Sequence, residues 1–272
     1  MADDGSGYDD PVCFSSAWEG KAIDFKYKDP ESKFIAGTWK LGKKQYERPR
    51  LATNWEFSMG LVSESEAMFE CNNTDNPDET ALMIIYMQVP RRSTEFLPPS
   101  ERKAQATDKL PHAPANQLWA LTTLHKHNSH SSLKLYGYKK SKQNDSGLVP
   151  GGYILYLLVQ KYPGVSLTED SFWQLSLPER DEIRQALKAT LLDCLDKGIN
   201  NYEDDISKIR WMREKKKVFH ACSPKQDGED ENGEDEWRDN IWYYWGLVAK
   251  KPDWRYDKND NGKKLDPSRW VL

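Results

Sequence analysis

Three consecutive carboxylates, Glu203, Asp204 and Asp205, are the clearest candidates in this chain for proton-transfer chemistry. A carboxylate beside a reacting group can act as a general base when its surroundings tune its pKa toward the working pH. The same triplet is also typical of a solvated loop in which an aspartate caps a following helix. The sequence therefore predicts these three residues as catalytic candidates and leaves the solvated loop open as the alternative.

A second candidate follows about fifteen residues later, where His220 and Cys222 are two positions apart. Alternation along a strand places both side chains on one face, so the imidazole could assist a thiolate nucleophile. Ordinary strand packing beside a loop cysteine is the alternative reading. The four cysteines are widely spaced and include no CxxC pair, so the sequence predicts no metal site.

The elements that would position these residues centre on one long helix, predicted over residues 176–198. Ser176 and Glu179 have capping-box spacing, and Gly198 can adopt the left-handed conformation that ends a helix. A buried strand over residues 152–159 precedes the helix, and a hairpin over residues 209–219 follows it. Helical spacing predicts a buried face of Ile183, Ala186, Leu187, Thr190, Leu191, Cys194 and Leu195, and an exposed face of Asp181, Arg184, Lys188 and Asp196.

The N-terminal half has the pattern of an antiparallel sheet. Residues 81–89 form an apolar run typical of a buried strand, and alternation predicts two further strands over residues 55–59 and 66–70. Residues 91–115 carry many prolines and charges, which predicts a loop with a short helix, and residues 117–124 are predicted to be helical.

Three blocks of sequence, in this order, resemble the middle of a protein kinase, and more closely the divergent kinase-like proteins of filamentous fungi. They are GLVPGGYILYLLVQKYPGVSL, LPERDEIRQALKATLLDCLDKGI and WMREKKKVF. The resemblance covers roughly residues 80–222 and implies an α+β, two-lobed kinase-like fold with an antiparallel N-lobe sheet and a truncated helical C-lobe. Because these blocks contain no chemical signature, the resemblance concerns the fold and not an activity.

The same resemblance sets the expected domain boundaries. Residues 13–160 would form the N-lobe-like sheet domain and residues 161–272 the truncated C-lobe. Residues 1–12 are expected to form a disordered acidic leader. Residues 227–236 are expected to form an acidic, solvated loop, because their carboxylates repel one another and apolar side chains are lacking.

The positions that carry kinase chemistry are degenerate in this sequence. Kinases use a strand lysine, a helix glutamate, and an asparagine and an aspartate that hold magnesium. Alignment by the resemblance places Ile84, Gln117, Lys208 and Cys222 at these four positions. A lysine and a cysteine do not supply the oxygen ligands that Mg²⁺ requires. The resemblance therefore implies a pseudokinase without metal-dependent phosphotransfer and without a cofactor.

A cleft that lacks phosphate-binding groups could instead be lined by aromatic side chains and enclose an apolar molecule. Tyr162, Trp211 and His220 are the candidate ligand-binding residues. Two functions remain open on the sequence. The first is a binding or scaffold module for an unknown protein partner, and the second is a repurposed enzyme that binds an apolar small molecule and directs proton transfer or cyclisation in a fungal metabolite pathway.

Composition excludes several other classes. The formal net charge is −4 with both signs mixed along the chain, so no nucleic-acid or anionic-membrane partner is predicted. No apolar run approaches the roughly 20 residues that span a bilayer, and the acidic N-terminus is unlike a signal peptide. An intracellular, cytoplasmic location is therefore expected.

Overall fold

The computed structural model of the chain describes residues 11–25, 37–201, 205–220, 224–225, 242, 245–250 and 270–271. The chain divides into two compact units. The first comprises residues 1–118 and 135–161, and the second comprises residues 119–134 and 162–272. The acidic loop expected over residues 227–236 and nearly all of the acidic leader lie outside the described residues.

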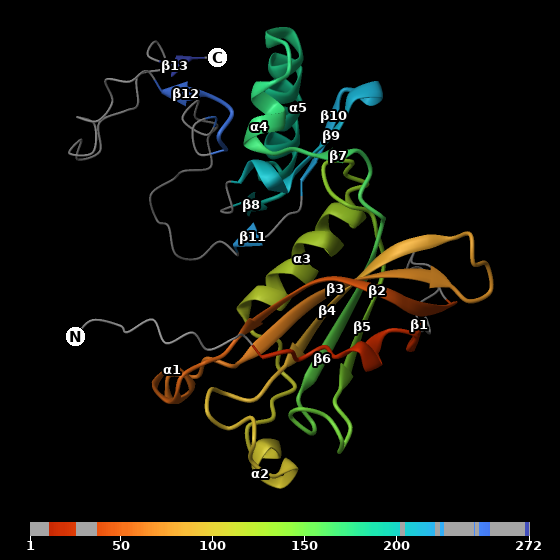
Figure 1. The fold of residues 1–272 in the computed structure, drawn as a ribbon, viewed down its shortest axis with the longest axis vertical. Helices are drawn as coiled ribbons and strands as arrows, with labels where there is room; N and C mark the ends of the chain where they lie inside the picture. The colour runs from red at the N-terminus through yellow and green to blue at the C-terminus, as the bar shows by residue number, and fades with distance from the viewer. Residues whose placement is uncertain are drawn as a thin grey trace. The chain divides into compact units, whose positions relative to one another are not determined.

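The first unit is built on one six-stranded antiparallel sheet with the strand order β1-β2-β3-β4-β6-β5 (Figure 1). The buried strands expected over residues 81–89 and 152–159 are confirmed as β4 and β6, and β6 is buried along its whole length. The strands are β1 (Ala22–Phe25), β2 (Gly37–Arg50), β3 (Glu64–Asn73), β4 (Thr80–Gln88), β5 (Leu135–Lys142) and β6 (Tyr153–Val159). The chain is therefore a mixed α+β protein with an antiparallel sheet.

The sheet curls, because its two edge strands approach each other. Lys139 of β5 donates a hydrogen bond from its Nζ to the backbone oxygen of Asp24 in β1 at 3.0 Å, and the two strands lie in contact. The face inside this curl carries a hydrophobic core of the unit, which includes Phe14, Trp39, Leu41, Phe69, Met83, Ile85, Met87, Ile154, Tyr156 and Leu158. Burial of these large apolar side chains is the main force that holds the sheet together.

The opposite face of the sheet is also buried at its centre. Side chains alternate along a strand, so Ile84 points away from the core that holds Met83 and Ile85. In the register of the sheet Ile84 pairs with Met68 of β3 and Leu157 of β6. We refer to this side of the sheet as the Ile84 face.

One predicted strand of the first unit is wrong. Residues 55–59 were expected to form a strand by alternation, but Asn54–Ser58 form the short helix α1. The Thr53 hydroxyl accepts a hydrogen bond from the backbone of Glu56, and the Glu56 carboxylate accepts one from the backbone of Thr53. This capping box fixes the first turn and outweighs the strand propensity of Trp55 and Phe57.

The remaining elements of this half are a 3-10 helix, η1 (Ser16–Trp18), and two α-helices, α2 (Pro99–Lys103) and α3 (His112–Lys126). Both α-helices were expected from the sequence. The last part of α3 belongs to the second unit, where Ala120 and Leu124 form a small core with Cys194 and Ile199.

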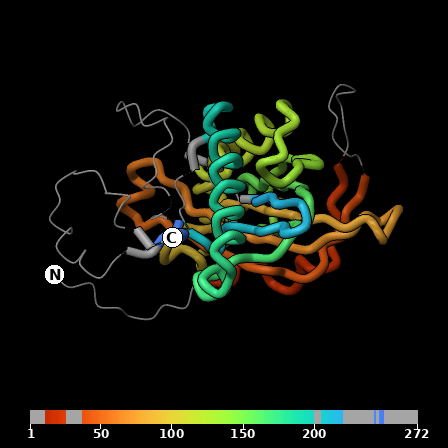
Figure 2. The backbone as a smooth tube through the Cα atoms, turned by 90° about the horizontal axis from the view of Figure 1, so that it is seen from above, coloured from red at the N-terminus to blue at the C-terminus, as the bar shows by residue number. Residues whose placement is uncertain are grey.

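The second unit is organised by α5 (Leu177–Leu195), the helix predicted from its end signals. The Ser176 hydroxyl accepts a hydrogen bond from the backbone of Glu179, and Gly198 has a φ of +70°. Figure 2 shows the hairpin that follows lying alongside α5, and Thr190 donates from its hydroxyl to the backbone oxygen of Val218 in that hairpin at 3.2 Å. The expectation of one long helix followed by a hairpin is thus confirmed.

The other elements of the second unit are short. They are β7 (Val165–Ser166), α4 (Glu169–Trp173), β8 (Asn200–Asn201), η2 (Ile206–Lys208), β9 (Ile209–Met212), η3 (Arg213–Lys215), β10 (Lys217–His220), β11 (Pro224–Lys225), β12 (Ala249–Lys250) and β13 (Trp270–Val271). Strands β10, β9 and β7 form one three-stranded sheet, and the other four strands pair as β11 with β8 and β12 with β13.

The expected exposure of Arg184 is wrong. Arg184 is buried on α5, where its Nε donates to the backbone oxygen of Leu247 at 2.9 Å and one terminal nitrogen donates to Asp181 at 2.5 Å. Its guanidinium also lies over the ring of Phe172, with its carbon 5.6 Å from the ring centroid. Residues distant in sequence therefore cover a position that helical spacing places on the polar side.

Within the described residues, no helix combines the length and the apolar character that crossing a bilayer requires.

Candidate functional site

The predicted catalytic carboxylates are described only at Asp205, because Glu203 and Asp204 lie outside the described residues. Asp205 is exposed and caps η2, where its Oδ1 accepts a hydrogen bond from the backbone nitrogen of Ser207 at 2.7 Å. This hydrogen bond lowers the pKa of Asp205. A carboxylate with a lowered pKa is a weak base. The capping contact of Asp205 is the one expected for an aspartate in a solvated loop, which was the alternative to a catalytic role. The catalytic role of the three carboxylates stays a prediction.

The structure describes both residues of the first unit that the sequence predicted as degenerate kinase positions. Ile84 lies in the middle of β4 with only 4% of its surface exposed, and its strand neighbours are Met68 and Leu157. Gln117 lies on α3 and is half-buried. Ile84 and its strand neighbours have apolar side chains, so none of these side chains can bind a phosphate.

Of the two residues predicted as degenerate kinase positions in the second unit, the structure describes one. Lys208 ends η2 immediately before β9 and is half-buried, whereas Cys222 lies outside the described residues. The backbone of His220 pairs with Ile209 in the β9–β10 hairpin. The proposed assistance of Cys222 by His220 therefore stays a prediction.

Trp211 is the predicted ligand-binding residue that the structure places beside a pocket. It lies in β9 with 2% of its surface exposed, and it pairs with Val218 of β10 and Val165 of β7. The pocket has a volume of about 600 Å³, within the range of small-molecule sites. We call it the Trp211 pocket; its lining is Gly164, Val165, Ser166, Leu167, Ser171, Leu175, Trp211, Met212, Arg213 and Glu214.

The polar side chains of the Trp211 pocket are largely engaged in bonds of their own. Ser166 donates from its hydroxyl to the backbone oxygen of Ser207 at 3.1 Å, and Ser171 donates to that of Thr168 at 3.0 Å. Arg213 donates from its Nε to Glu179 at 2.6 Å. Since these groups already have partners, the pocket mainly offers apolar surface, which suits an apolar molecule more than a charged one.

Glu179 is the residue of this site that sequence reasoning missed. Its backbone takes part in the helix cap, but its carboxylate reaches the hairpin, where Oε1 accepts hydrogen bonds from Trp211 Nε1 at 3.2 Å and from Arg213 Nε. The carboxylate thereby fixes the orientation of the indole that borders the pocket. The capping-box spacing predicted that Glu179 caps the helix, and no sequence signal indicated that its carboxylate instead contacts Trp211 and Arg213.

Tyr162 does not line this pocket. The guanidinium of Arg210 lies over its ring, with its carbon 4.8 Å from the ring centroid, which is the geometry of a cation–π contact. The structure therefore brings Trp211 to the pocket and pairs Tyr162 with Arg210. His220 remains a ligand-binding prediction, because only its backbone is described.

The described residues include no group of three or more histidine, cysteine, aspartate or glutamate side chains arranged to hold a metal ion. Glu203, Asp204 and Cys222 lie outside the described residues.

Comparison with known proteins gives a weak structural likeness. No protein-family model and no curated protein matches the sequence. The kinase PK-1 of the Cydia pomonella granulovirus is similar in structure, with a TM-score of 0.35 and 14% sequence identity over 68% of this chain and 51% of the viral chain. The chain thus spans about half the length of that kinase, and at this TM-score the likeness decides neither its fold nor its function.

Proposed function

We propose that this chain is a kinase-like protein that binds a partner or ligand without metal-dependent phosphotransfer, a pseudokinase acting as a binding or scaffold module. The observation that carries the proposal is the burial of Ile84 in the middle of β4. The sequence resemblance predicts that this position corresponds to the phosphate-binding lysine of a kinase.

The order of elements supports the kinase-like part of the proposal. Kinases carry this lysine on the third strand of an antiparallel sheet, and the glutamate that pairs with it on the helix that follows. In the first unit, β2, β3 and β4 are three consecutive antiparallel strands, and α3 precedes the last two strands, β5 and β6. With this assignment β4 is the lysine strand and α3 the glutamate helix.

The residues at these two positions support the loss of phosphotransfer. Ile84 has no group that can contact a phosphate, and Met68 and Leu157 beside it form an apolar surface. Gln117 carries no charge and so cannot form the ion pair that holds the lysine of an active kinase. Restoring one residue would therefore not restore the site.

Thermal unfolding with ATP and Mg²⁺ tests this proposal. A ligand at 100 times its dissociation constant adds about 2.7 kcal/mol of stability, which corresponds to a shift of a few degrees for a chain of this size. We expect no shift with millimolar ATP and Mg²⁺, and no incorporation of radiolabelled phosphate, while an active kinase treated in parallel gives both. A reproducible shift of several degrees together with phosphate incorporation would refute the proposal.

A second candidate function is favoured by the Trp211 pocket. Its apolar lining and its volume of about 600 Å³ support binding of an apolar small molecule, as the repurposed-enzyme hypothesis requires. An enzyme that works by folding a bound substrate into a reactive shape needs few polar groups. The residues that would direct proton transfer in such an enzyme stay the predicted carboxylates Glu203, Asp204 and Asp205.

Binding of a neutral apolar dye, N-phenyl-1-naphthylamine, tests this second function. Val165 lines the pocket but has 63% of its surface exposed, so Val165→Lys places a charge at the pocket with little cost in folding. Val12 is 72% exposed and lies outside this pocket, so Val12→Lys is the matched control. We expect Val165→Lys to weaken dye binding about tenfold and Val12→Lys to leave it unchanged. Equal binding by both variants would remove the Trp211 pocket from consideration.

A further inference from the structure

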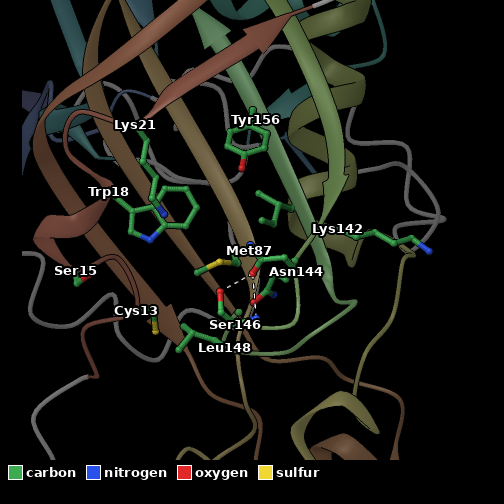
Figure 3. Close-up of a pocket in the computed structure, with 13 residues that line it drawn as sticks. Cys13, Ser15, Trp18, Lys21, Met87, Lys142, Asn144, Ser146, Leu148 and Tyr156 are labelled. Atoms are coloured by element: carbon green, nitrogen blue, oxygen red, sulfur yellow. Dashed lines mark hydrogen bonds between the residues drawn. The ribbon is translucent and has the colours of Figure 1, made fainter. Parts of the chain in front are cut away.

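A second pocket lies in the first unit, between the segment that leads into β1 and the hairpin that joins β5 to β6 (Figure 3). Its volume is about 380 Å³, which suits a small organic molecule. We call it the Trp18 pocket; its lining is Cys13, Ser15, Trp18, Lys21, Met87, Lys142, Gln143, Asn144, Ser146, Gly147, Leu148, Ile154 and Tyr156.

The position of the Trp18 pocket follows from the curl of the sheet. Met87, Ile154 and Tyr156 belong to the core inside the curl, and alternation along the strands places them on the side opposite the Ile84 face. The pocket therefore lies beside the gap where the edge strands β1 and β5 approach each other. The mouths of closed or nearly closed sheets are frequent ligand sites, because the strands there hold side chains rigidly around a space.

The walls of this pocket combine apolar surface with an unused hydrogen-bond donor. Trp18, Met87, Leu148 and Ile154 supply apolar surface. Tyr156 has only 8% of its surface exposed, and its hydroxyl has no hydrogen-bond partner among the described residues. Figure 3 shows the Tyr156 oxygen directed into the space beside Trp18 and Met87. Since a buried hydroxyl usually has a partner, this one is placed to bond a ligand.

The charge at the pocket is positive. Lys21 and Lys142 line it, and no aspartate or glutamate does. Lys142 points away from the other labelled side chains in Figure 3 and bonds Asp108 at 3.1 Å, so its charge is already paired. The Nζ of Lys21 lies 3.9 Å from the ring centroid of Trp18, and Lys21 forms no ion pair within the described part of the chain. This ammonium is therefore available to an anion.

We propose that the Trp18 pocket binds a small organic anion with an aromatic body, such as an aromatic carboxylate. Trp18 and Met87 contact the ring of the ligand, Lys21 binds its carboxylate, and Tyr156 donates a hydrogen bond to one of its oxygens. A cation on a flexible stem and a fixed hydroxyl together select an anion over a neutral molecule of the same shape.

Binding at this pocket is noncovalent. Cys13 is the one thiol in the lining, and burial together with the nearby carboxylate of Glu47 raises its pKa to about 11. The thiolate, which is the reactive form, is therefore scarce at neutral pH.

The site is independent of the proposed pseudokinase function. It uses the face inside the curl of the sheet, whereas that function rests on Ile84, on the opposite face. Failure of one therefore leaves the other standing, and the two tests use different ligands.

Calorimetric titration with 1-naphthoate tests the proposal, and two molecules of the same shape serve as controls. These are the neutral 1-naphthalenemethanol and the cationic 1-naphthylmethylamine. We expect 1-naphthoate to bind in the micromolar to low millimolar range, at least tenfold more tightly than either control. Absence of binding by 1-naphthoate at millimolar concentration, or equal binding of all three molecules, would overturn the proposal.

Two variants locate the binding and a third controls for charge. Lys21→Met removes the ammonium and keeps the apolar stem, and Tyr156→Phe removes only the hydroxyl. Lys140 lies on the same hairpin but is exposed and does not line the pocket, so Lys140→Met is the matched control. We expect Lys21→Met to weaken 1-naphthoate binding about tenfold, Tyr156→Phe about fivefold, and Lys140→Met not at all. Parent-like affinity in both Lys21→Met and Tyr156→Phe would show that the anion binds elsewhere and would refute the site.

Discussion

The Tyr153 hydroxyl donates a hydrogen bond to the Glu64 carboxylate across 2.9 Å, and both side chains are buried on the Ile84 face of the sheet. Burial raises the pKa of Glu64, and the hydrogen bond from Tyr153 opposes that rise without cancelling it. Burial, followed by the charge of Glu64, raises the pKa of Tyr153 as well. Glu64 is therefore a buried acid that accepts a hydrogen bond from a neutral donor, the Tyr153 hydroxyl.

Removing the donor should destabilise the first unit. Tyr153→Phe leaves the carboxylate of Glu64 buried without this hydrogen bond, and we expect it to lower the free energy of unfolding by about 1–3 kcal/mol at pH 7. Urea unfolding measures the change. Tyr138→Phe, at a tyrosine that is exposed, is the control and should stay within about 0.5 kcal/mol of the parent. If Tyr153→Phe lost no more stability than the Tyr138→Phe control, water would have replaced the missing donor.

The acid itself should make stability depend on pH. Because the pKa of Glu64 is raised in the folded protein, folding binds its proton more tightly, and this contribution to stability is fully present below the unfolded value of about 4.3. It is lost as the pH rises from that value through the folded pKa. Glu64→Gln keeps an acceptor for Tyr153 and does not titrate. We therefore expect Glu64→Gln to gain stability relative to the parent between pH 4 and pH 7, measured by urea unfolding at several pH values. A difference that stays constant over this range would contradict the raised pKa.

The sequence predicted the parts of this fold whose signals are local or strongly periodic. β4 and β6 are long apolar runs, and α5 has a capping serine at one end and Gly198 at the other, so neighbours in the sequence suffice to define them. The strand predicted at Trp55 failed because a local capping box competes with alternation, and that box spans only four residues. The correct predictions of β4, β6 and α5 and the wrong strand at Trp55 all depend on residues that are close together in the sequence.

The candidate sites could be predicted only in part, because they depend on contacts between distant residues. Trp211 was named as a ligand-binding residue, but the carboxylate that orients it comes from Glu179, 32 residues away. The Trp18 pocket joins Trp18 to the β5–β6 hairpin more than 120 residues later, and no spacing rule connects such segments. Strand curl and loop closure decide these contacts, and neither is visible in a residue pattern.

Arg184 gives a test of one such distant contact within the second unit. Arg184→Met keeps much of the apolar stem but leaves the backbone oxygen of Leu247 without its donor, so we expect a loss of about 1–3 kcal/mol in the free energy of unfolding. Asp181→Asn is the control, since it removes the charge that Arg184 contacts at the surface and keeps an acceptor there. We expect that variant to change stability by less than about 1 kcal/mol. If the two variants were equally destabilised, the ion pair and not the contact with Leu247 would hold Arg184.

The wall of the Trp211 pocket depends on a glycine. Gly164 has a φ of +78°, and a Cβ added there would lie 2.5 Å from the backbone oxygen of Trp211. Gly198 has a φ of +70° and nothing within 4 Å of such a Cβ, so Gly198→Ala isolates the cost of the left-handed backbone alone.

These two glycines separate backbone strain from a steric clash. We expect Gly198→Ala to lower the free energy of unfolding by about 1 kcal/mol and Gly164→Ala by clearly more, because only the latter must also move β7 away from β9. Urea unfolding gives both values, and binding of N-phenyl-1-naphthylamine shows whether the pocket changes shape. Gly164→Ala should weaken dye binding and Gly198→Ala should not. Equal losses of stability with unchanged dye binding in both variants would show that the close approach of Gly164 to Trp211 does not shape this pocket.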